Sequence, residues 1–448
     1  MIPVVPTTLS VVLCLAVHAA HATSSEKYYD PALWADYYLA ASWDGYYVDN
    51  TWTGATHGTM AEPFTNIQAA INFANATNGA FGANTINVKD TGVEYPGPLM
   101  FPNINAMRLK GWGGTPTIAY RGSGPHSTIM SGTNYASPLY ACMPPSQVGL
   151  EDLVIINETT APGDWYCADI QAWVSWEPGL TNTPERYRFG VTNCVFNGAG
   201  RNGGVRLRDL DQGHMVPWGI PYANYHTSLV QQCRFDDCRT GVMLMPLQCA
   251  RIADNTFTSN GVAITALQTN FWPYIRPYTN VVIAFNIFHA TAGDAIKADN
   301  FDQLLVQNNT FYQNGGTGVN VNAAALGYHG TAGLHNNLLY ENYAGFSADA
   351  ADTNALIANN NLLYTNAVAD PWDSFGTSNV YADPQFVSTD PLDPLFLAPL
   401  AGGPADNRPG HGGVNFIGAK APVPEPAAAL LMLCCMMLPA RRKTRPRA

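Results

Sequence analysis

The sequence predicts an all-β solenoid, a parallel β-helix, over most of its 448 residues. The first observation is a six-residue phrase that is apolar at its first place, Cys or Asn at its fourth, and Phe or Leu at its sixth. It occurs at 191–196, 230–235, 252–257, 283–288, 306–311, 334–339 and 357–362. Successive phrases begin 22 to 39 residues apart and alternate with a period of two, whereas a helical repeat would show a period of 3.6.

A second, glycine-led phrase is the next observation. It follows most of the first phrases, at 204–207, 241–244, 261–264, 293–296, 318–321 and 345–348. Two or three short strands with a glycine turn between them form one coil of a solenoid.

The fourth place of the first phrase predicts an internal ladder. Identical residues in successive coils stack at roughly 4.8 Å, so the Asn amides would bond to one another along the solenoid axis. We interpret this ladder as structural, because such asparagines hold turns and do not form a binding site.

Segments on both sides of the repeats extend the prediction. Residues 46–49 read as a first strand, 64–76 as a helix that plugs the open core, and 86–88 with 92–95 as a first coil. Residues 382–386, 395–397 and 417–419 read as closing coils. In this order the pieces resemble the right-handed parallel β-helix proteins called pectate-lyase-like, so we expect one monomeric domain over 46–420.

The N-terminus predicts export. An apolar run at 9–17 leads to small residues that end in Ala20-His21-Ala22, so residues 1–22 read as a signal peptide cleaved after Ala22. Residues 23–45, rich in Tyr, Trp and Ala, would be a leading helix docked on the body or a loose arm.

The C-terminus has three parts: Pro424-Glu425-Pro426, an uncharged run over 427–438, and a cluster of five basic residues. The uncharged run is shorter than the ~20 residues of a comfortable membrane span. Together the parts resemble the PEP-CTERM sorting signal of Gram-negative bacteria. That resemblance implies that 423–447 form a transient inner-membrane anchor, that an exosortase processes it, and that the protein reaches the outer surface or the extracellular matrix.

Charge and cysteine content narrow the partners. Residues 23–421 carry 17 basic against 32 acidic residues (22 less 5, and 33 less 1), a net charge of −15, which argues against nucleic acid. Six cysteines lie in the exported body, at 142, 167, 194, 233, 238 and 249. An oxidising compartment would permit bridges among them, but their connectivity cannot be read from the sequence.

Catalytic candidates come from strand alternation in the second phrase. It predicts one outward column of Arg206, Met243, Ala263, Ala295, Asn320 and Ser347, and another of Arg208, Met245, Thr265, Lys297, Asn322 and Asp349. A polyuronate lyase needs a base and a cation at the carboxylate. Lys297, Asp299 and Asp349 are the candidate catalytic set, and the alternative is a solvated Lys-Asp pair.

Carbohydrate-binding candidates lie in three long connections, 174–188, 211–228 and 270–279. Their aromatic residues can stack on sugar rings while bonding hydroxyls, or can instead pack on one another. The candidates are Trp176, Trp218, Tyr222, Tyr225, Trp272, Tyr274 and Tyr278, with Arg206 and Arg208 as partners for a uronic acid. No cofactor is expected, although Asp209 and Asp211 would allow calcium.

Three functions therefore remain open. The leading prediction is an exported protein that binds polysaccharide through an aromatic groove. The alternatives are a polysaccharide lyase or glycoside hydrolase that acts on an acidic glycan, and a structural protein of a biofilm matrix. Fold alone does not choose among them.

Overall fold

The computed structural model contains thirty strands and one helix in the residues it describes. These residues are 44–78, 83–101, 106–131, 147–172, 189–209, 227–245, 249–267, 280–299, 303–322, 331–348, 356–368, 376–406 and 415–423.

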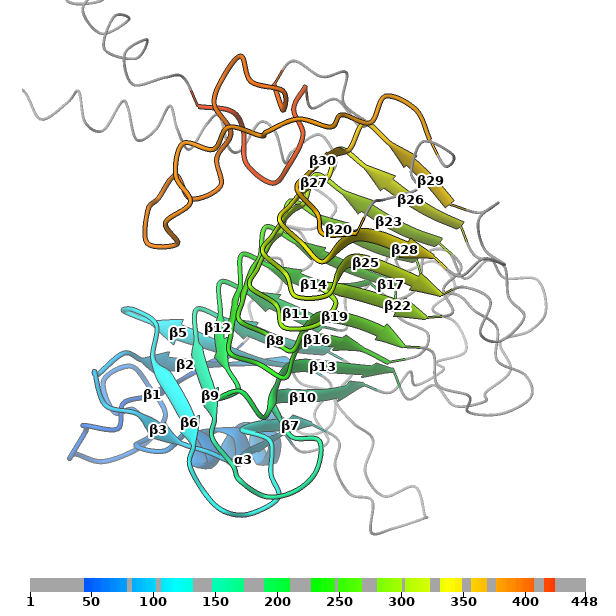
Figure 1. The fold of residues 1–448 in the computed structure, drawn as a ribbon. Helices are drawn as coiled ribbons and strands as arrows, with labels where there is room; N and C mark the ends of the chain where they lie inside the picture. Colours follow the sequence, from blue (N-terminus) through cyan, green and yellow to red (C-terminus); the bar gives the residue numbers. More distant parts are fainter. Residues whose placement is uncertain are drawn as a thin grey trace, which may run out of the picture.

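The strands form three sheets in which all neighbouring strands are parallel (Figure 1). Sheet A has eleven strands: β1 (Asp44–Val48), β2 (Ala83–Lys89), β5 (Ala106–Trp112), β8 (Gln147–Glu151), β11 (Phe189–Thr192), β14 (Thr227–Gln231), β17 (Cys249–Ala253), β20 (Asn280–Ala284), β23 (Gln303–Gln307), β26 (Thr331–His335) and β29 (Leu356–Asn359). Sheet B has ten: β3 (Tyr95–Pro96), β6 (Thr117–Tyr120), β9 (Val154–Asn157), β12 (Val195–Asn197), β15 (Arg234–Asp236), β18 (Thr256–Thr258), β21 (Ile287–His289), β24 (Thr310–Tyr312), β27 (Leu338–Tyr340) and β30 (Leu362–Tyr364). Sheet C has nine: β4 (Leu99–Phe101), β7 (Ile129–Ser131), β10 (Tyr166–Ala172), β13 (Gly203–Asp209), β16 (Thr240–Leu244), β19 (Val262–Leu267), β22 (Ile296–Asp299), β25 (Thr317–Asn322) and β28 (Ala344–Ala348).

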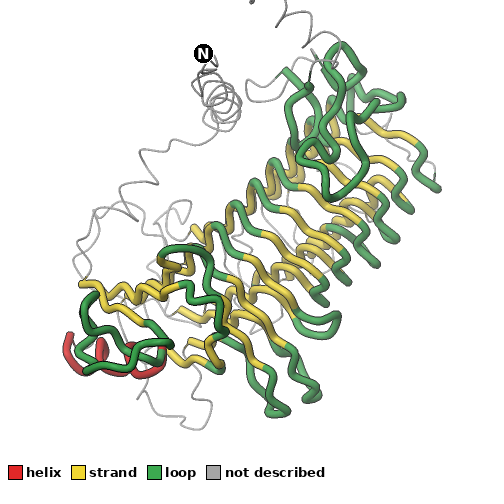
Figure 2. Tube along the Cα trace, turned by 90° about the vertical axis from the view of Figure 1, so that its left-hand side faces the viewer, coloured by secondary structure: helices red, strands yellow, loops and turns green. Residues whose placement is uncertain are grey.

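The chain visits sheets A, B and C in turn and then rises to the next coil, so the predicted parallel β-helix is confirmed. The view along its side shows the coils stacked in one elongated body (Figure 2). Register is maintained from coil to coil: Val191 pairs with Val230, which pairs with Ile252, which pairs with Ile283. Because the same place in each coil points inward, apolar residues at that place form continuous rows in the core.

A row of five phenylalanines illustrates this core. Their rings stack with centroids 4.7–5.0 Å apart and with interplanar angles of 12° or less, and all five are fully buried: Phe196, Phe235, Phe257, Phe288 and Phe311. The ring spacing matches the strand spacing, so stacking follows from the register.

The predicted asparagine ladder is present, but the phrase at 357–362 was placed one residue too early. Leu334 pairs with Ala358 and Ile357 is exposed, so Asn361 and not Asn360 continues the ladder. Between neighbouring coils, each side-chain amide donates to the next side-chain carbonyl over 3.0–3.2 Å, through Asn255, Asn286, Asn309, Asn337, Asn361 and Asn379. A second ladder, which the sequence reading did not single out, runs through Asn314, Asn342 and Asn366 at the next corner. Both ladders satisfy buried backbone groups at turns, which confirms their structural role.

The N-terminal plug begins later than predicted. Asn66 caps the helix α3 (Ile67–Asn78) by accepting a hydrogen bond from the Ala69 N–H over 3.0 Å. Phe64, expected in the helix, instead extends the strand pairing: its N–H donates to Tyr47 and its carbonyl accepts from Asp49.

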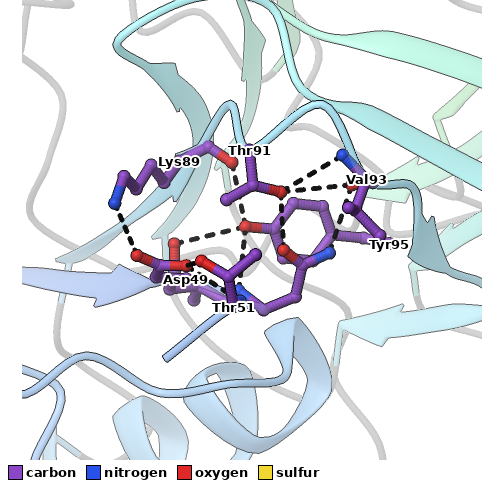
Figure 3. A network of polar contacts seen from close by, with 8 residues as sticks. Asp49, Thr51, Lys89, Thr91, Val93 and Tyr95 are labelled. Carbon is purple, nitrogen blue, oxygen red and sulfur yellow. Dashed lines mark hydrogen bonds and ion pairs between the residues drawn. The ribbon is translucent and has the colours of Figure 1, made fainter. Parts of the chain in front are cut away.

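A polar network fastens this end to the first coil (Figure 3). The buried Asp49 carboxylate accepts hydrogen bonds from Lys89 Nζ and Thr51 Oγ1, both over 2.6 Å. The Tyr95 hydroxyl donates to the carbonyl of Lys89 over 2.9 Å, and the Asn50 N–H donates to the same hydroxyl over 3.3 Å. Strands β1, β2 and β3 are thereby joined by side chains as well as by the sheets.

The predicted closing coils are wrong in part. Residues 376–380 add a fragment of a coil, because Val380 pairs with Leu362. Residues 381–406 and 415–423, which we call the C-terminal strap, form only isolated β-bridges and pack on the outside of the solenoid (Figure 1, orange and red). They cover outward residues of sheet B, with Phe396 and Leu397 against Ile287 and Tyr312.

The strap is held by hydrogen bonds as well as by apolar contacts. Asn308 Nδ2 donates to the carbonyl of Phe416 over 3.1 Å, and the Ala419 N–H donates to Thr310 Oγ1 over 2.9 Å. The strap is therefore an integral part of the body. Among the described residues, no helix has the length and apolar character needed to cross a membrane.

Candidate functional site

Lys297 and Arg206, two residues predicted from the sequence, lie in one outward-facing column on sheet C. Successive register partners define it, and we call it the outer column: Asp169, Arg206, Met243, Thr265, Lys297, Asn320 and Ser347. Lys297 therefore lies in line with Arg206, whereas the sequence reading had assigned it to the column of Arg208.

The error comes from the glycine of the second phrase. Val242 pairs with Ile264, so Gly241 aligns with Ala263, and Gly261 lies two places earlier in the register, immediately before β19. A shift of two residues in the alignment does not change which side of the sheet a side chain faces. It does place each outward side chain beside a different outward neighbour in the next coil. Ala263 and Ala295, predicted to face outward, instead align with Gly241 and Gly318. A Cβ at that place points toward core side chains such as Phe257 and Leu339, so both alanines are fully buried.

The N-terminal half of the outer column is a closed ion pair. Arg206 Nε donates to Asp169 Oδ1 over 2.9 Å, and Nη2 contacts the other carboxylate oxygen. The guanidinium also lies over the Tyr166 ring, 4.4 Å from its centroid. Burial raises the pKa of Asp169, and Arg206 opposes that rise. Arg206 is thus engaged within the protein, and only 12% of its side chain is exposed.

The C-terminal half of the outer column is open. Lys297 and Ser347 are exposed and Asn320 is half-buried. Within the described ranges, Lys297 forms no ion pair. Asn320 is oriented by a 2.8 Å hydrogen bond from its Nδ2 to Asp294 Oδ2, and the other oxygen of that carboxylate accepts from the Thr317 N–H. An ammonium, an amide and a hydroxyl thus face outward on three successive coils.

Asp299 follows Lys297 on the same face of β22 and pairs in register with Asn322. Burial raises the pKa of the Asp299 carboxyl, the Lys297 ammonium lowers it, and Asp294 raises it further. The two predicted catalytic residues therefore share one strand. The third, Asp349, lies outside the described residues, directly after the end of β28.

The predicted aromatic residues lie outside the described residues, as does the side chain of Arg208. The described strands nevertheless fix where their segments start. The connections that carry Trp176, Trp218 and Trp272 follow β10, β13 and β19, so each begins at the carboxyl end of a sheet C strand. Parallel strands end at one edge, so these connections begin at the same corner of their coils.

Two site residues were missed by sequence reasoning. Asp169 meets Arg206 across 37 residues, and Asp294 meets Asn320 across 26. Asp169 has a detectable signal, because an acidic residue between apolar Ala168 and Ile170 must face outward on an alternating strand.

The described residues contain no evident metal site. In the part of the chain that the structure describes, no group of three or more His, Cys, Asp or Glu side chains is arranged to hold a metal ion. Asp211, one of the two residues considered for calcium, lies outside that part, as does the side chain of Asp209.

Comparison with known proteins agrees with the architecture. Residues 185–362 match a family model described as "Right handed beta helix region". No curated protein matches the chain. The three parallel sheets and this match together show that the fold is a right-handed parallel β-helix.

Proposed function

We propose that this right-handed β-helix binds polysaccharide along the outer face of sheet C. The observation that supports it best is the open half of the outer column, where Lys297, Asn320 and Ser347 offer one polar group per coil. Sugars are recognised by hydrogen bonds to hydroxyls combined with aromatic stacking. The column supplies the first, and the connections with Trp218 and Trp272 start at its edge and would supply the second.

An acidic glycan suits this face better than a neutral one. Lys297 is exposed and forms no ion pair among the described residues, and Asp299 is its acidic neighbour on the same face, whereas Arg206 is already neutralised by Asp169 in direct contact. A carboxylate that receives a charge-assisted hydrogen bond from Lys297 would gain more than a neutral hydroxyl at the same place. Because the body is strongly acidic overall, attraction must come from this local cation.

Affinity electrophoresis of the purified protein in gels that contain acidic or neutral polysaccharides tests the proposal. Lys297→Ala should weaken the affinity for an acidic polysaccharide by at least about tenfold, since a charged hydrogen bond contributes roughly 1.5–3 kcal/mol. Arg234→Ala removes the same charge from the outer face of sheet B, at an exposed side chain, and should change nothing. Equal retardation of wild type and Lys297→Ala would contradict the proposal.

Catalysis is the second candidate function, favoured by one observation. Lys297 and Asp299 alternate on one strand, and burial keeps the pKa of Asp299 raised. A basic and an acidic side chain close together are the residue types that general acid–base chemistry on a glycan uses. Unsaturated-uronate absorbance and new reducing ends, measured in the same incubations, would reveal product; an enzyme would lose both in Lys297→Ala.

Export to the cell surface or matrix is part of the proposal and rests on the two chain ends. The apolar N-terminal run would direct secretion, and Pro424-Glu425-Pro426 with the basic tail would hold the protein until processing. Fractionation of cells that produce wild type or a variant with all three motif residues replaced tests this: the variant should stay in the membrane fraction.

A protein with no affinity for any polysaccharide would favour the structural matrix role.

A further inference from the structure

Two cysteines occupy one position in successive coils. Thr192 pairs with Gln231 and Val195 with Arg234, so Cys194 and Cys233, which lie between these pairs, are register neighbours. The Arg234 N–H donates to the carbonyl of Cys194 over 2.8 Å. Register neighbours on adjacent parallel strands have Cα atoms roughly 4.8 Å apart. Disulfides span Cα separations of about 4.4–6.8 Å.

Both thiols point into the core, and the two residues are 1% and 3% exposed. Each thiol lies 3.2 Å from the carbonyl oxygen two residues before it in the sequence, that of Thr192 or of Gln231, so the two side chains run side by side. Burial raises the pKa of the Cys194 thiol, and the adjacent Cys233 thiol raises it further. The thiols are therefore neighbours as well as the backbones.

Their place in the fold is the start of the first asparagine ladder. From Asn255 onward, side-chain amides at this position link each coil to the next along the axis. Thiols cannot make amide-to-amide bonds, so the coils of β11–β13 and β14–β16 lack that link. A covalent link would replace it at the one pair of coils where the ladder residue is cysteine twice in succession.

We propose that Cys194 and Cys233 form a disulfide under oxidising conditions. Each thiol loses its proton, one S–S bond forms, and the two electrons pass to the disulfide of a thiol oxidant, which is reduced to two thiols. Because both sulfurs are buried in the finished fold, the exchange takes place before these coils close. The bond would enclose residues 195–232, and with them the connection that carries Trp218, Tyr222 and Tyr225.

The remaining described thiols make the inference specific. Cys167 and Cys238 are also buried and free, but they lie two coils apart, in the coils of β8–β10 and β14–β16. Two strand spacings separate their Cα atoms by roughly 10 Å along the axis. Both thiols reach toward the strand of the intervening coil, Cys167 to the carbonyl of Asn197 and Cys238 to that of Phe196. The Cα separation nevertheless exceeds the ~7 Å limit beyond which two cysteines cannot be bridged without backbone movement.

The test is to refold the full chain in a mixture of oxidised and reduced glutathione, alkylate remaining thiols in denaturant, and map peptides without reduction. We expect a linked pair of peptides that contain Cys194 and Cys233, lighter than the two free peptides by two hydrogen atoms, with Cys167 and Cys238 alkylated. Alkylation of both Cys194 and Cys233, or a bridge from either to another cysteine, would overturn the proposal.

A second measurement does not depend on any substitution. The oxidised protein should melt several degrees above the same protein after reduction, because the bond restricts a long loop in the unfolded chain. Equal melting temperatures for oxidised and reduced forms, with the bond mapped as present, would remove the stabilising role. Neither result depends on glycan binding, so this inference and the proposed function fail separately.

Discussion

Replacement of Asn309 by alanine should destabilise the solenoid strongly. Asn309 is fully buried in the middle of the first ladder. Its Nδ2 donates to the carbonyls of Ile283 and Gln307 and to Asn337 Oδ1, over 2.9–3.0 Å. Its Oδ1 accepts from the N–H and the side-chain amide of Asn286 over 2.9 and 3.0 Å. Alanine would abolish all five hydrogen bonds at once.

The size of this destabilisation depends on which hydrogen bonds the partners of Asn309 keep after the substitution. The side-chain amide of Asn286 keeps two carbonyl acceptors, and the carbonyl of Gln307 still accepts from the Phe285 N–H. The Asn286 N–H loses its acceptor in a dry core, at a cost of about 1–3 kcal/mol, and four further bonds contribute about 0.5–1 kcal/mol each. Since such terms are not additive, we expect a loss of roughly 3–5 kcal/mol in the free energy of unfolding.

Urea unfolding followed by far-UV circular dichroism measures this loss, provided that the slope of the free energy of unfolding against urea concentration is the same in both proteins. Thr331→Ala is the matched control, because Thr331 is exposed at the start of β26 and should change stability by less than about 0.5 kcal/mol. A loss below about 1 kcal/mol in Asn309→Ala would refute the view that the ladder holds the coils together.

Three other perturbations test particular contacts. Gly111→Ala should destabilise strongly, because an added Cβ would lie 2.0 Å from the carbonyl oxygen of Asp152; thermal denaturation measures it. Burial opposes ionisation of Asp49, but hydrogen bonds from Lys89 and Thr51 lower the pKa of its carboxyl overall. The ionised carboxylate therefore stabilises the fold at pH values above its unfolded pKa, and this stabilisation is lost as the pH falls through the folded pKa. Asp49→Asn should therefore flatten the acid limb of a stability–pH curve below about pH 4, and an unchanged limb would count against the network. Phe416→Ala should loosen the strap and speed its proteolysis, whereas Leu392→Ala, at a side chain 91% exposed, should not.

The sequence by itself determined the solenoid and its interior. A residue that recurs at one place in every coil must stack on its copies, so the asparagine ladder and the phenylalanine row follow from the repeat alone. The capping helix was also predictable, with its start misplaced by three residues. Phe64 is compatible with helix or strand, and only its pairing partner Val48 decides between them.

Only the tertiary structure decided the composition of the outer face. Glycines at 204, 241, 261 and 293 look equivalent in the sequence, yet those at 261 and 293 belong to turns that precede their strands. Connection lengths vary between coils, so counting from a glycine cannot fix which outward residues become neighbours. The register of hydrogen bonds fixes it, and it brought Lys297 into line with Asn320 and Arg206.

The C-terminal strap was likewise decided by tertiary contacts. Phe396, Leu397 and Ile417 are as apolar as core residues, and the sequence gives no sign that they cover the outside of sheet B. Burial depends on apolar character and not on which side of a sheet removes the side chain from water. Local pattern therefore specifies that such residues are buried, while packing against outward Ile287, Tyr312 and Leu338 specifies where.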